Sequence, residues 1–286
     1  TDDLATLTTD QIRALDSGQI AALTTTQMAN LASDDLSALS TAQIKALSTR
    51  QIVALDSADL AVLSSAQLGA LSSDQLRVIQ TSGVGGIGTD ALKALTSSQI
   101  GALTTAQLDA LGSTQVASLS SGQLRALTTA QIASLGTDDL NALSSDQFRL
   151  LSSAQIGALT SAQAANLEST DLAALTTAQV GALSTSSIAA FDSADFAAMG
   201  SAQIAALGTA QIRAIDTADI VGLSTDAVRA LVEAARPVAP PAARGWPEFE
   251  DVVPSAAQAP ADTPAPEEWP DPVLPGTQTT PEIPAD

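Results

Sequence analysis

The chain has 286 residues, a net charge of −20, and no Cys, His or Tyr. Without Cys it has neither disulfides nor thiolate metal sites, and without His and Tyr it lacks most side chains that transfer protons near neutral pH. The negative charge disfavours nucleic acid and anionic membrane surfaces as partners. No apolar run approaches the roughly 20 residues of a bilayer span, so we expect no membrane insertion. Because it starts at Thr1 and not Met, we interpret the chain as trimmed, by signal removal or at a chosen boundary.

Residues 8–231 form twenty-eight consecutive eight-residue repeats, or octads. Positions 1 to 8 read T/S, S/T, A/D, Q, I/L, x, A, L, as in 104–111. Position 2 is Ser or Thr in every octad, and position 8 is always large and apolar. Such repetition overrides a division into two ordinary domains, because repeat arrays grow by stacking. All thirteen prolines follow Leu231, so we predict a repeat domain over 1–231 and a Pro-rich acidic tail over 232–286.

The spacing of the apolar positions predicts short helices. Positions 5 and 8 lie on one face of a helix but on opposite faces of a strand. A single long helix is excluded, because eight residues rotate the apolar stripe by about 80° per octad. A helix this short is unstable alone and must bury its apolar residues against other octads. We therefore predict an all-α solenoid of very short helices with a continuous Ile/Leu/Ala core, in which the small residue at position 7 permits close approach.

The sequence pattern leaves two features to be inferred: which residue is the N-cap of each helix, and how many octads form one coil. We favour the position 2 hydroxyl as the N-cap; the rival is position 1, within a capping box T/S-x-x-Q. Where position 4 is Asp, position 1 is never Ser or Thr, so we expect these two positions to bond each other or a neighbouring octad. Basic residues at position 6 recur at multiples of sixteen, as Arg13, Lys45 and Arg77 do, which predicts two octads per coil.

The tenth octad, 80–87, departs most from the pattern. Its glycines Gly83, Gly85 and Gly86, with Gly88 of the next octad, predict a bend, a loosened coil or a close-packing site. Gly83, Gly85 and Gly88 formally match the dinucleotide fingerprint G-x-G-x-x-G. That motif requires a preceding strand and a following helix, and the sequence offers no strand. We therefore predict no cofactor site here.

Paired acidic residues at positions 1 and 4 are candidate calcium ligands. Examples are Asp56 with Asp59 and Asp192 with Asp195. They lack the alternating oxygen ligands and central Gly of a calcium loop. We interpret them as helix caps and surface charge, with weak divalent binding as the alternative. We predict neither a metal site nor a catalytic residue, and the chain is not expected to be an enzyme.

The tail contains both tryptophans of the chain. Trp246, Phe249 and Trp269 lie in an extended, Pro-rich and acidic context, where large aromatics are typical anchors for a groove. We expect these residues to dock on the solenoid, on a neighbouring subunit or on a protein partner. The alternative is a flexible linker.

The segments 158–163 (ALTSAQ) and 174–180 (ALTTAQV) resemble the "ALTTAQ"-type octapeptide repeats of large secreted or surface-exposed bacterial proteins. The resemblance covers residues 8–231. It implies a bacterial, exported protein with a structural or adhesive role, and it carries no defined activity. We expect a rod-like subunit of an extracellular or cell-surface filament, layer or appendage that self-associates. The alternative is a monomeric adhesin stalk or protein-binding spacer.

Overall fold

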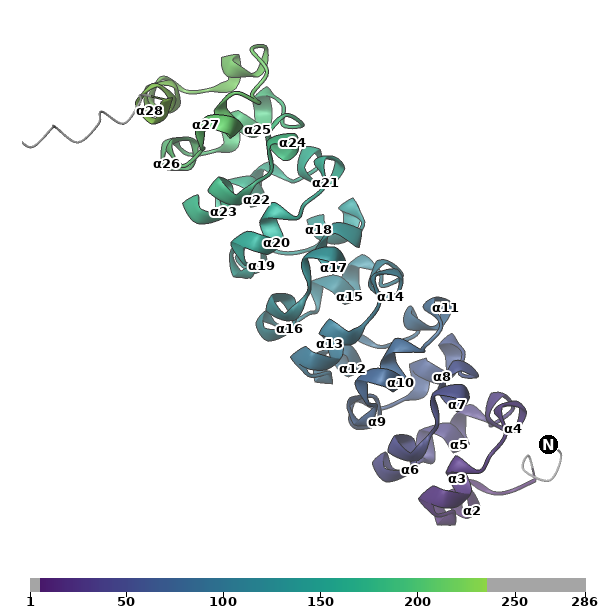
Figure 1. Ribbon diagram of the computed structural model, residues 1–286. Coiled ribbons are helices and arrows are strands. Elements are labelled where there is room, and N and C mark those ends of the chain that lie inside the picture. The colour runs from purple at the N-terminus through teal and green to yellow at the C-terminus, as the bar shows by residue number, and fades with distance from the viewer. Residues whose placement is uncertain (1–5, 236–286) are drawn as a thin grey trace, which may run out of the picture. The chain divides into compact units, whose positions relative to one another are not determined.

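The computed structural model describes residues 6–235, and every regular element in that part of the chain is helical (Figure 1). The predicted all-α solenoid is therefore confirmed. The last helix extends four residues past the final octad, and the compact unit that contains the helices spans Thr1–Pro237. The elements are α2 (Thr9–Ala14), α3 (Ser17–Ala21), α4 (Thr25–Ala29), α5 (Ser33–Ala38), α6 (Thr41–Ala46), α7 (Thr49–Val53), α8 (Ser57–Val62), α9 (Ser65–Ala70), α10 (Ser73–Arg77), α11 (Thr81–Val84), α12 (Thr89–Ala94), α13 (Ser97–Ala102), α14 (Thr105–Asp109), α15 (Ser113–Ala117), α16 (Ser121–Ala126), α17 (Thr129–Ser134), α18 (Thr137–Asn141), α19 (Ser145–Leu150), α20 (Ser153–Gly157), α21 (Ser161–Ala165), α22 (Ser169–Ala174), α23 (Thr177–Ala182), α24 (Thr185–Ile188), α25 (Ser193–Ala198), α26 (Ser201–Ala205), α27 (Thr209–Ile212), the 3-10 helix η1 (Asp219–Gly222) and α28 (Thr225–Ala235).

One octad consists of a short helix and an extended link. In the octad 40–47, α6 lies between Ser40 (φ −69°, ψ 159°) and Leu47 (φ −59°, ψ 132°). The backbone N–H of Gln43 donates to the Ser40 hydroxyl at 3.2 Å, and the Ser40 N–H donates to Oε1 of Gln43 at 2.7 Å. This is a capping box. The preferred prediction of a cap at position 2 was wrong: position 1 is the N-cap, and position 2 is already the first helical residue.

The apolar positions form one core along the stack. Ile44 at position 5 is fully buried, and Leu47 at position 8 is 3% exposed. The aromatic residues at these positions, Phe148, Phe191 and Phe196, are also buried in this core. The rings of Phe191 and Phe196 contact each other edge to face. Burying each such side chain contributes roughly 1.5–3 kcal/mol. Helices of four to six residues are therefore held by this core and not by their own hydrogen bonds.

Each helix packs against the third helix further along the chain. Thus α6 contacts α9, and α9 contacts α12. At the same time Gln43 reaches the carbonyl oxygens of Ile12 and Leu15, four octads before it. One superhelical turn therefore takes more than three and fewer than four octads, and the prediction of two octads per coil was wrong. Two octads per coil would require each extended link, at positions 8 and 1, to rotate the chain by half a turn. The observed rotation per octad is smaller, so the sixteen-residue spacing of basic residues does not correspond to one coil.

In some octads position 6 contacts the following coil. A Cβ on Gly157 would lie 2.6 Å from the carbonyl oxygen of Ala182, three octads later. Where position 6 is Arg149, its Nε instead donates to the equivalent carbonyl oxygen of Ala174 at 3.1 Å. At these octads position 6 contacts the next coil, whereas other position 6 side chains, such as Lys93, are exposed.

The tenth octad keeps its place in the stack. Helix α11 contacts α8 and α14, as other helices do with their third neighbours (Figure 1). A Cβ on Gly86 would overlap the backbone of Ser57, and one on Gly83 would lie 3.0 Å from Cδ1 of Leu60. The structure therefore places close packing at Gly83 and Gly86.

The two remaining glycines of that segment are less constrained. A Cβ on Gly85 would make an ordinary contact at 3.9 Å, and one on Gly88 would meet nothing within 4 Å. Residues 6–235 contain no strand, so the glycine fingerprint here lacks the βαβ unit that dinucleotide binding requires.

Replacing Gly86 by Ala is expected to destabilise the protein by about 1–3 kcal/mol, because the new methyl group displaces the Ser57 backbone. Gly88→Ser is the matched control: it adds a capping hydroxyl in open space and should be neutral or stabilising by up to about 1 kcal/mol. Thermal unfolding followed by circular dichroism measures both. Equal midpoints for the two variants would contradict the close-packing role of Gly86.

Candidate functional site

The most distinctive polar feature is a ladder of glutamines at position 4. Oε1 of Gln107 accepts the backbone N–H of its own N-cap, Thr104, at 2.8 Å. Its Nε2 donates to the carbonyl oxygens of Leu76 and Ile79 at 2.8 and 2.7 Å. These acceptors lie 31 and 28 residues earlier, at positions 5 and 8 of the fourth octad back. One buried side chain therefore caps a helix and joins it to the preceding coil.

This arrangement recurs along the stack. Each bond contributes about 0.5–1.5 kcal/mol net, whereas leaving a buried carbonyl unpaired costs about 1–3 kcal/mol. Most of these side chains are almost fully buried, so both halves of the amide are needed. The position 4 glutamines whose Nε2 bonds an earlier coil are Gln43, Gln51, Gln67, Gln75, Gln99, Gln107, Gln115, Gln123, Gln131, Gln147, Gln155, Gln163, Gln179, Gln203 and Gln211.

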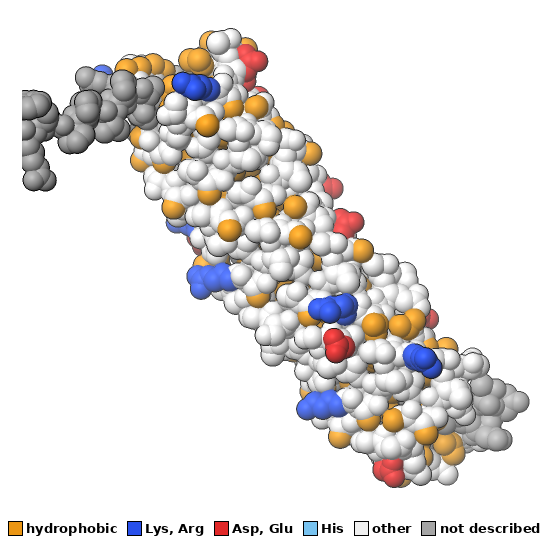
Figure 2. Space-filling view, in the orientation of Figure 1, with side chains coloured by type: hydrophobic (Ala, Val, Ile, Leu, Met, Phe, Trp, Pro, Cys, Tyr) orange, Lys and Arg blue, Asp and Glu red, His pale blue; other side chains and the backbone are white. Residues whose placement is uncertain are grey.

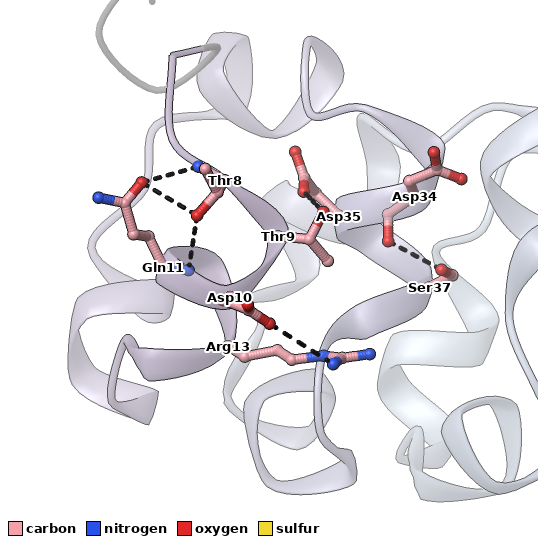
Figure 3. Close-up of polar contacts among 8 residues, drawn as sticks. All are labelled: Thr8, Thr9, Asp10, Gln11, Arg13, Asp34, Asp35 and Ser37. Carbon is pink, nitrogen blue, oxygen red and sulfur yellow. Dashed lines mark hydrogen bonds and ion pairs between the residues drawn. The ribbon is translucent and has the colours of Figure 1, made fainter.

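The ladder is unused in the first three octads. Gln11, Gln19 and Gln27 keep the capping bond to their own N-caps. Within residues 6–235 their amide nitrogens have no acceptor. Figure 3 shows the amide nitrogen of Gln11 pointing away from the neighbouring helices. Three amide donors are therefore presented together at this end of the described solenoid.

Aspartate replaces glutamine at position 4 in two ways. In the pairs Asp56 with Asp59 and Asp192 with Asp195, the two residues form a capping box. When position 1 is not Asp, the carboxylate accepts from a hydroxyl of the preceding coil: Thr9 Oγ1 donates to Asp35 at 2.9 Å (Figure 3). Ser113 and Asp139 make the same bond at 2.8 Å. The expected coupling of positions 1 and 4 is thus confirmed for the Gln octads and for Asp56–Asp59 and Asp192–Asp195, but not for Asp216 and Asp219, where η1 replaces the octad helix.

Acidic residues stack over α22, α25 and η1, which contact one another in that order. Their octads contain no Lys or Arg. Asp195 is 8% exposed. Burial, followed by the charges of Asp192 and Asp219, raises its pKa above the ordinary 3.8, against a backbone hydrogen bond from Asp192 that lowers it. In the described part of the chain, no group of three potential ligands is placed to hold a metal ion. The stacked residues are Glu168, Asp171, Asp192, Asp195, Asp216 and Asp219.

The basic residues are dispersed over the surface that Figure 2 shows. Lys93 pairs with Asp90 on its own helix at 3.8 Å, and both side chains are largely exposed. Such exposed pairs contribute little to stability. Arg77 donates to the carbonyl oxygen of Ala102 in the next coil at 3.4 Å, so its guanidinium is partly engaged.

The tail residues predicted to dock, Trp246, Phe249 and Trp269, lie outside the described residues. An open hollow between α26 and α28 is lined by small side chains and by Asp226, Arg229 and Glu233. Within 6–235, no helix combines the length and apolarity that a membrane crossing requires. Sequence reasoning missed the amide donors of the glutamines, although the regular Gln at position 4 was the available signal.

These features define an octad-repeat α-solenoid whose coils are joined by buried glutamines. The ALTTAQ repeat family model matches it at residues 1–33, 28–58, 52–89, 84–121, 119–150, 133–169, 164–199 and 188–225. The chain therefore belongs to the ALTTAQ repeat family. No curated protein sequence matches the chain.

Gln107→Glu is expected to lower stability by about 2–5 kcal/mol. The carboxylate still caps α14, but it cannot donate to the carbonyl oxygens of Leu76 and Ile79. Gln11→Glu is the matched control, because it retains the cap and loses no donor bond within residues 6–235; its effect should stay within about 0.5 kcal/mol. Urea unfolding at neutral pH measures both. Similar losses in the two variants would show that the ladder is not what joins the coils.

Asp195→Asn should raise stability at neutral pH. The folded state raises the pKa of Asp195, so the ionised carboxylate opposes folding once the pH exceeds that raised value. The amide oxygen of Asn can still accept the Asp192 N–H. The gain in melting temperature should disappear below the ordinary pKa of 3.8, where the wild-type carboxyl is protonated in both states. A gain that persists in acid would contradict a charge effect.

Proposed function

We propose that the chain is a non-enzymatic structural protein whose solenoid is a rod-like subunit of an extracellular or cell-surface filament, layer or appendage. The observation that carries the proposal is the glutamine ladder, in which the same amide contact joins coil after coil between Gln43 and Gln211. A second stack of carbonyl acceptors beside Gln11, Gln19 and Gln27 would extend the contact that already holds the solenoid together.

The core supports a structural role. Positions 5 and 8 fill the interior continuously from α2 to α27, with no insertion that would build a cleft. The composition adds to this, since the usual proton-transferring residues His, Cys and Tyr are absent. The extracellular, bacterial location rests on the resemblance of the repeats to those of exported bacterial proteins.

A monomeric adhesin stalk or protein-binding spacer is the second candidate. It is favoured by the exposed basic side chains at position 6, such as Lys93 and Arg125. Their neighbours Arg77 and Arg149 bond the next coil instead, which leaves a discontinuous basic surface. The rod-like subunit is therefore the better supported function.

The test is the assembly state of the full-length chain, by sedimentation and electron microscopy across a concentration series. In the triple variant Gln11→Glu, Gln19→Glu and Gln27→Glu, the caps remain and the three donors are lost. If each contributes about 1 kcal/mol to the contact, association should weaken by at least about 100-fold. A control with Glu in place of the exposed position 6 residues Ala21, Ala29 and Ala165 adds the same charge without touching the donors.

End-to-end assemblies in the wild type and the control, weakened in the Gln→Glu variant, are the expected result. Isolated rods at every concentration would favour the monomeric spacer. Assemblies that persist equally in all three proteins would show that the contact lies elsewhere on the solenoid.

A further inference from the structure

A block of five octads occurs twice in the solenoid. Residues 56–95 and 192–231 share an Asp–Asp octad at their start, a Gly at position 7 of the fourth octad and an Ala at position 4 of the fifth. They also pack alike on the coil before them. A Cβ on Gly86 or on Gly222 would in each case overlap the backbone of the position 2 Ser three octads earlier. The two stretches are called the first block and the second block below.

The blocks differ on the side that faces the following coil. In the first block, Val84 and Leu92 at position 5 are fully buried. Helices α14 and α15 contact α11 and α12 there. In the second block, the equivalent residues Ile220 and Val228 are 40% and 39% exposed. Within residues 6–235, no later octad helix covers them. The first block therefore shows what kind of structure fits on the second.

The cover of the first block has two components. Helices α14 and α15 bring apolar core residues. Gln115 brings an amide nitrogen that donates to the carbonyl oxygens of Val84 and Ile87 at 3.3 and 2.7 Å. The carbonyl oxygens of Ile220 and Leu223 hold the equivalent places in the second block, and within residues 6–235 they receive no glutamine amide. A fitting cover must therefore present apolar side chains and glutamine amide donors together.

The coil that contains α2, α3 and α4 presents both. The amide nitrogens of Gln11, Gln19 and Gln27 have no acceptor within residues 6–235. Beside them at position 8, Leu15 and Leu23 are only partly buried, whereas the leucines at this position in the middle of the solenoid are buried. This face therefore carries donors and apolar groups, and the second block carries acceptors and apolar groups.

We propose that α2, α3 and α4 of a second copy of this chain pack on η1 and α28, cover Ile220 and Val228, and continue the glutamine ladder from one molecule to the next. The contact is heterologous, because two different faces meet, and its repetition builds an open filament. The inference rests on the proposed self-assembly and names the two faces that carry it.

A contact between the second blocks of two copies fits less well. It would bring backbone acceptors against backbone acceptors, so the carbonyl oxygens of Ile220 and Leu223 would gain no donor. Burying polar groups without partners opposes association. The two unlike faces satisfy each other, and two like faces do not.

Cysteine cross-linking tests the proposal in the full chain, which contains no Cys. One variant carries Leu23→Cys, and the other carries Val228→Cys and a small tag that changes its size. A short bismaleimide can join thiols on packed helices, whose axes lie about 8–10 Å apart. Val53→Cys with the same tag is the matched control, because Val53 is 40% exposed and Val228 is 39% exposed. Leu15→Cys replaces Leu23→Cys if that variant loses helical circular dichroism.

Mixing Leu23→Cys with Val228→Cys should give several-fold more mixed dimer than mixing it with Val53→Cys. The Val228→Cys variant alone should give little dimer. Sedimentation of the same samples measures assembly independently. Assemblies without excess mixed dimer would overturn this inference and leave the proposed function standing, whereas the absence of assemblies at every concentration would remove both.

Two further outcomes would assign the face of the second block to another occupant. A dominant dimer of Val228→Cys with itself would overturn the proposal in favour of a contact between like faces. A thiol at position 228 that reacts slowly with a soluble monofunctional maleimide at every dilution would also overturn it, because one chain would then cover this face by itself. Fast reaction on dilution and protection on assembly are the expected result.

Discussion

The solenoid depends on the side-chain amide at position 4, which couples a local structure to a distant one. Its oxygen completes the capping box of a helix too short to be stable alone, and its nitrogen binds carbonyl oxygens of the fourth octad back, as Gln107 does. The capping bond holds the Gln side chain in the rotamer that reaches the earlier coil. The bonds to the earlier coil in turn hold the side chain in place as a cap. A short repeated sequence can therefore build a long solenoid, because most octads carry a Gln at position 4 that makes both contacts.

The exceptions show how strongly this connection is required. Gly83 cannot make it, and Nε2 of Gln80 donates to the carbonyl oxygen of Val53 at 2.6 Å from a different position in the octad. Ser187 is too short to make two such bonds, yet its hydroxyl still reaches the carbonyl oxygen of Leu159 at 3.2 Å. Aspartates that cannot donate to carbonyls instead accept from the preceding coil, as Asp35 does from Thr9. Other side chains thus join coils in several of the octads that lack glutamine at position 4.

Much of the fold could be predicted from the sequence, because helix type and core positions follow from residue spacing. The number of octads per turn could not, since it depends on the dihedral angles of the link at positions 8 and 1, as at Leu47 and Ser40. The coupling of positions 1 and 4 was visible, but the invariant position 2 hydroxyl drew the cap assignment to the wrong residue. The regular Gln at position 4 showed that a donor was present, but its acceptors could not be identified, because backbone carbonyls leave no side-chain signature. The glycines of the tenth octad were visible in the sequence. That Gly83 and Gly86 pack closely, and Gly85 and Gly88 do not, could not be predicted, because it depends on the neighbouring coil.

The ladder also makes the two ends of the described solenoid chemically different. Within residues 6–235, every glutamine Nε2 bond between coils runs from a later octad to an earlier one, so amide donors face one way along the stack and backbone acceptors face the other. An end that offers amide donors is satisfied only by oriented acceptors, which favours one specific partner geometry. An end that exposes Val228 and Val232 is satisfied by any fitting apolar group and is the greater risk for non-specific association.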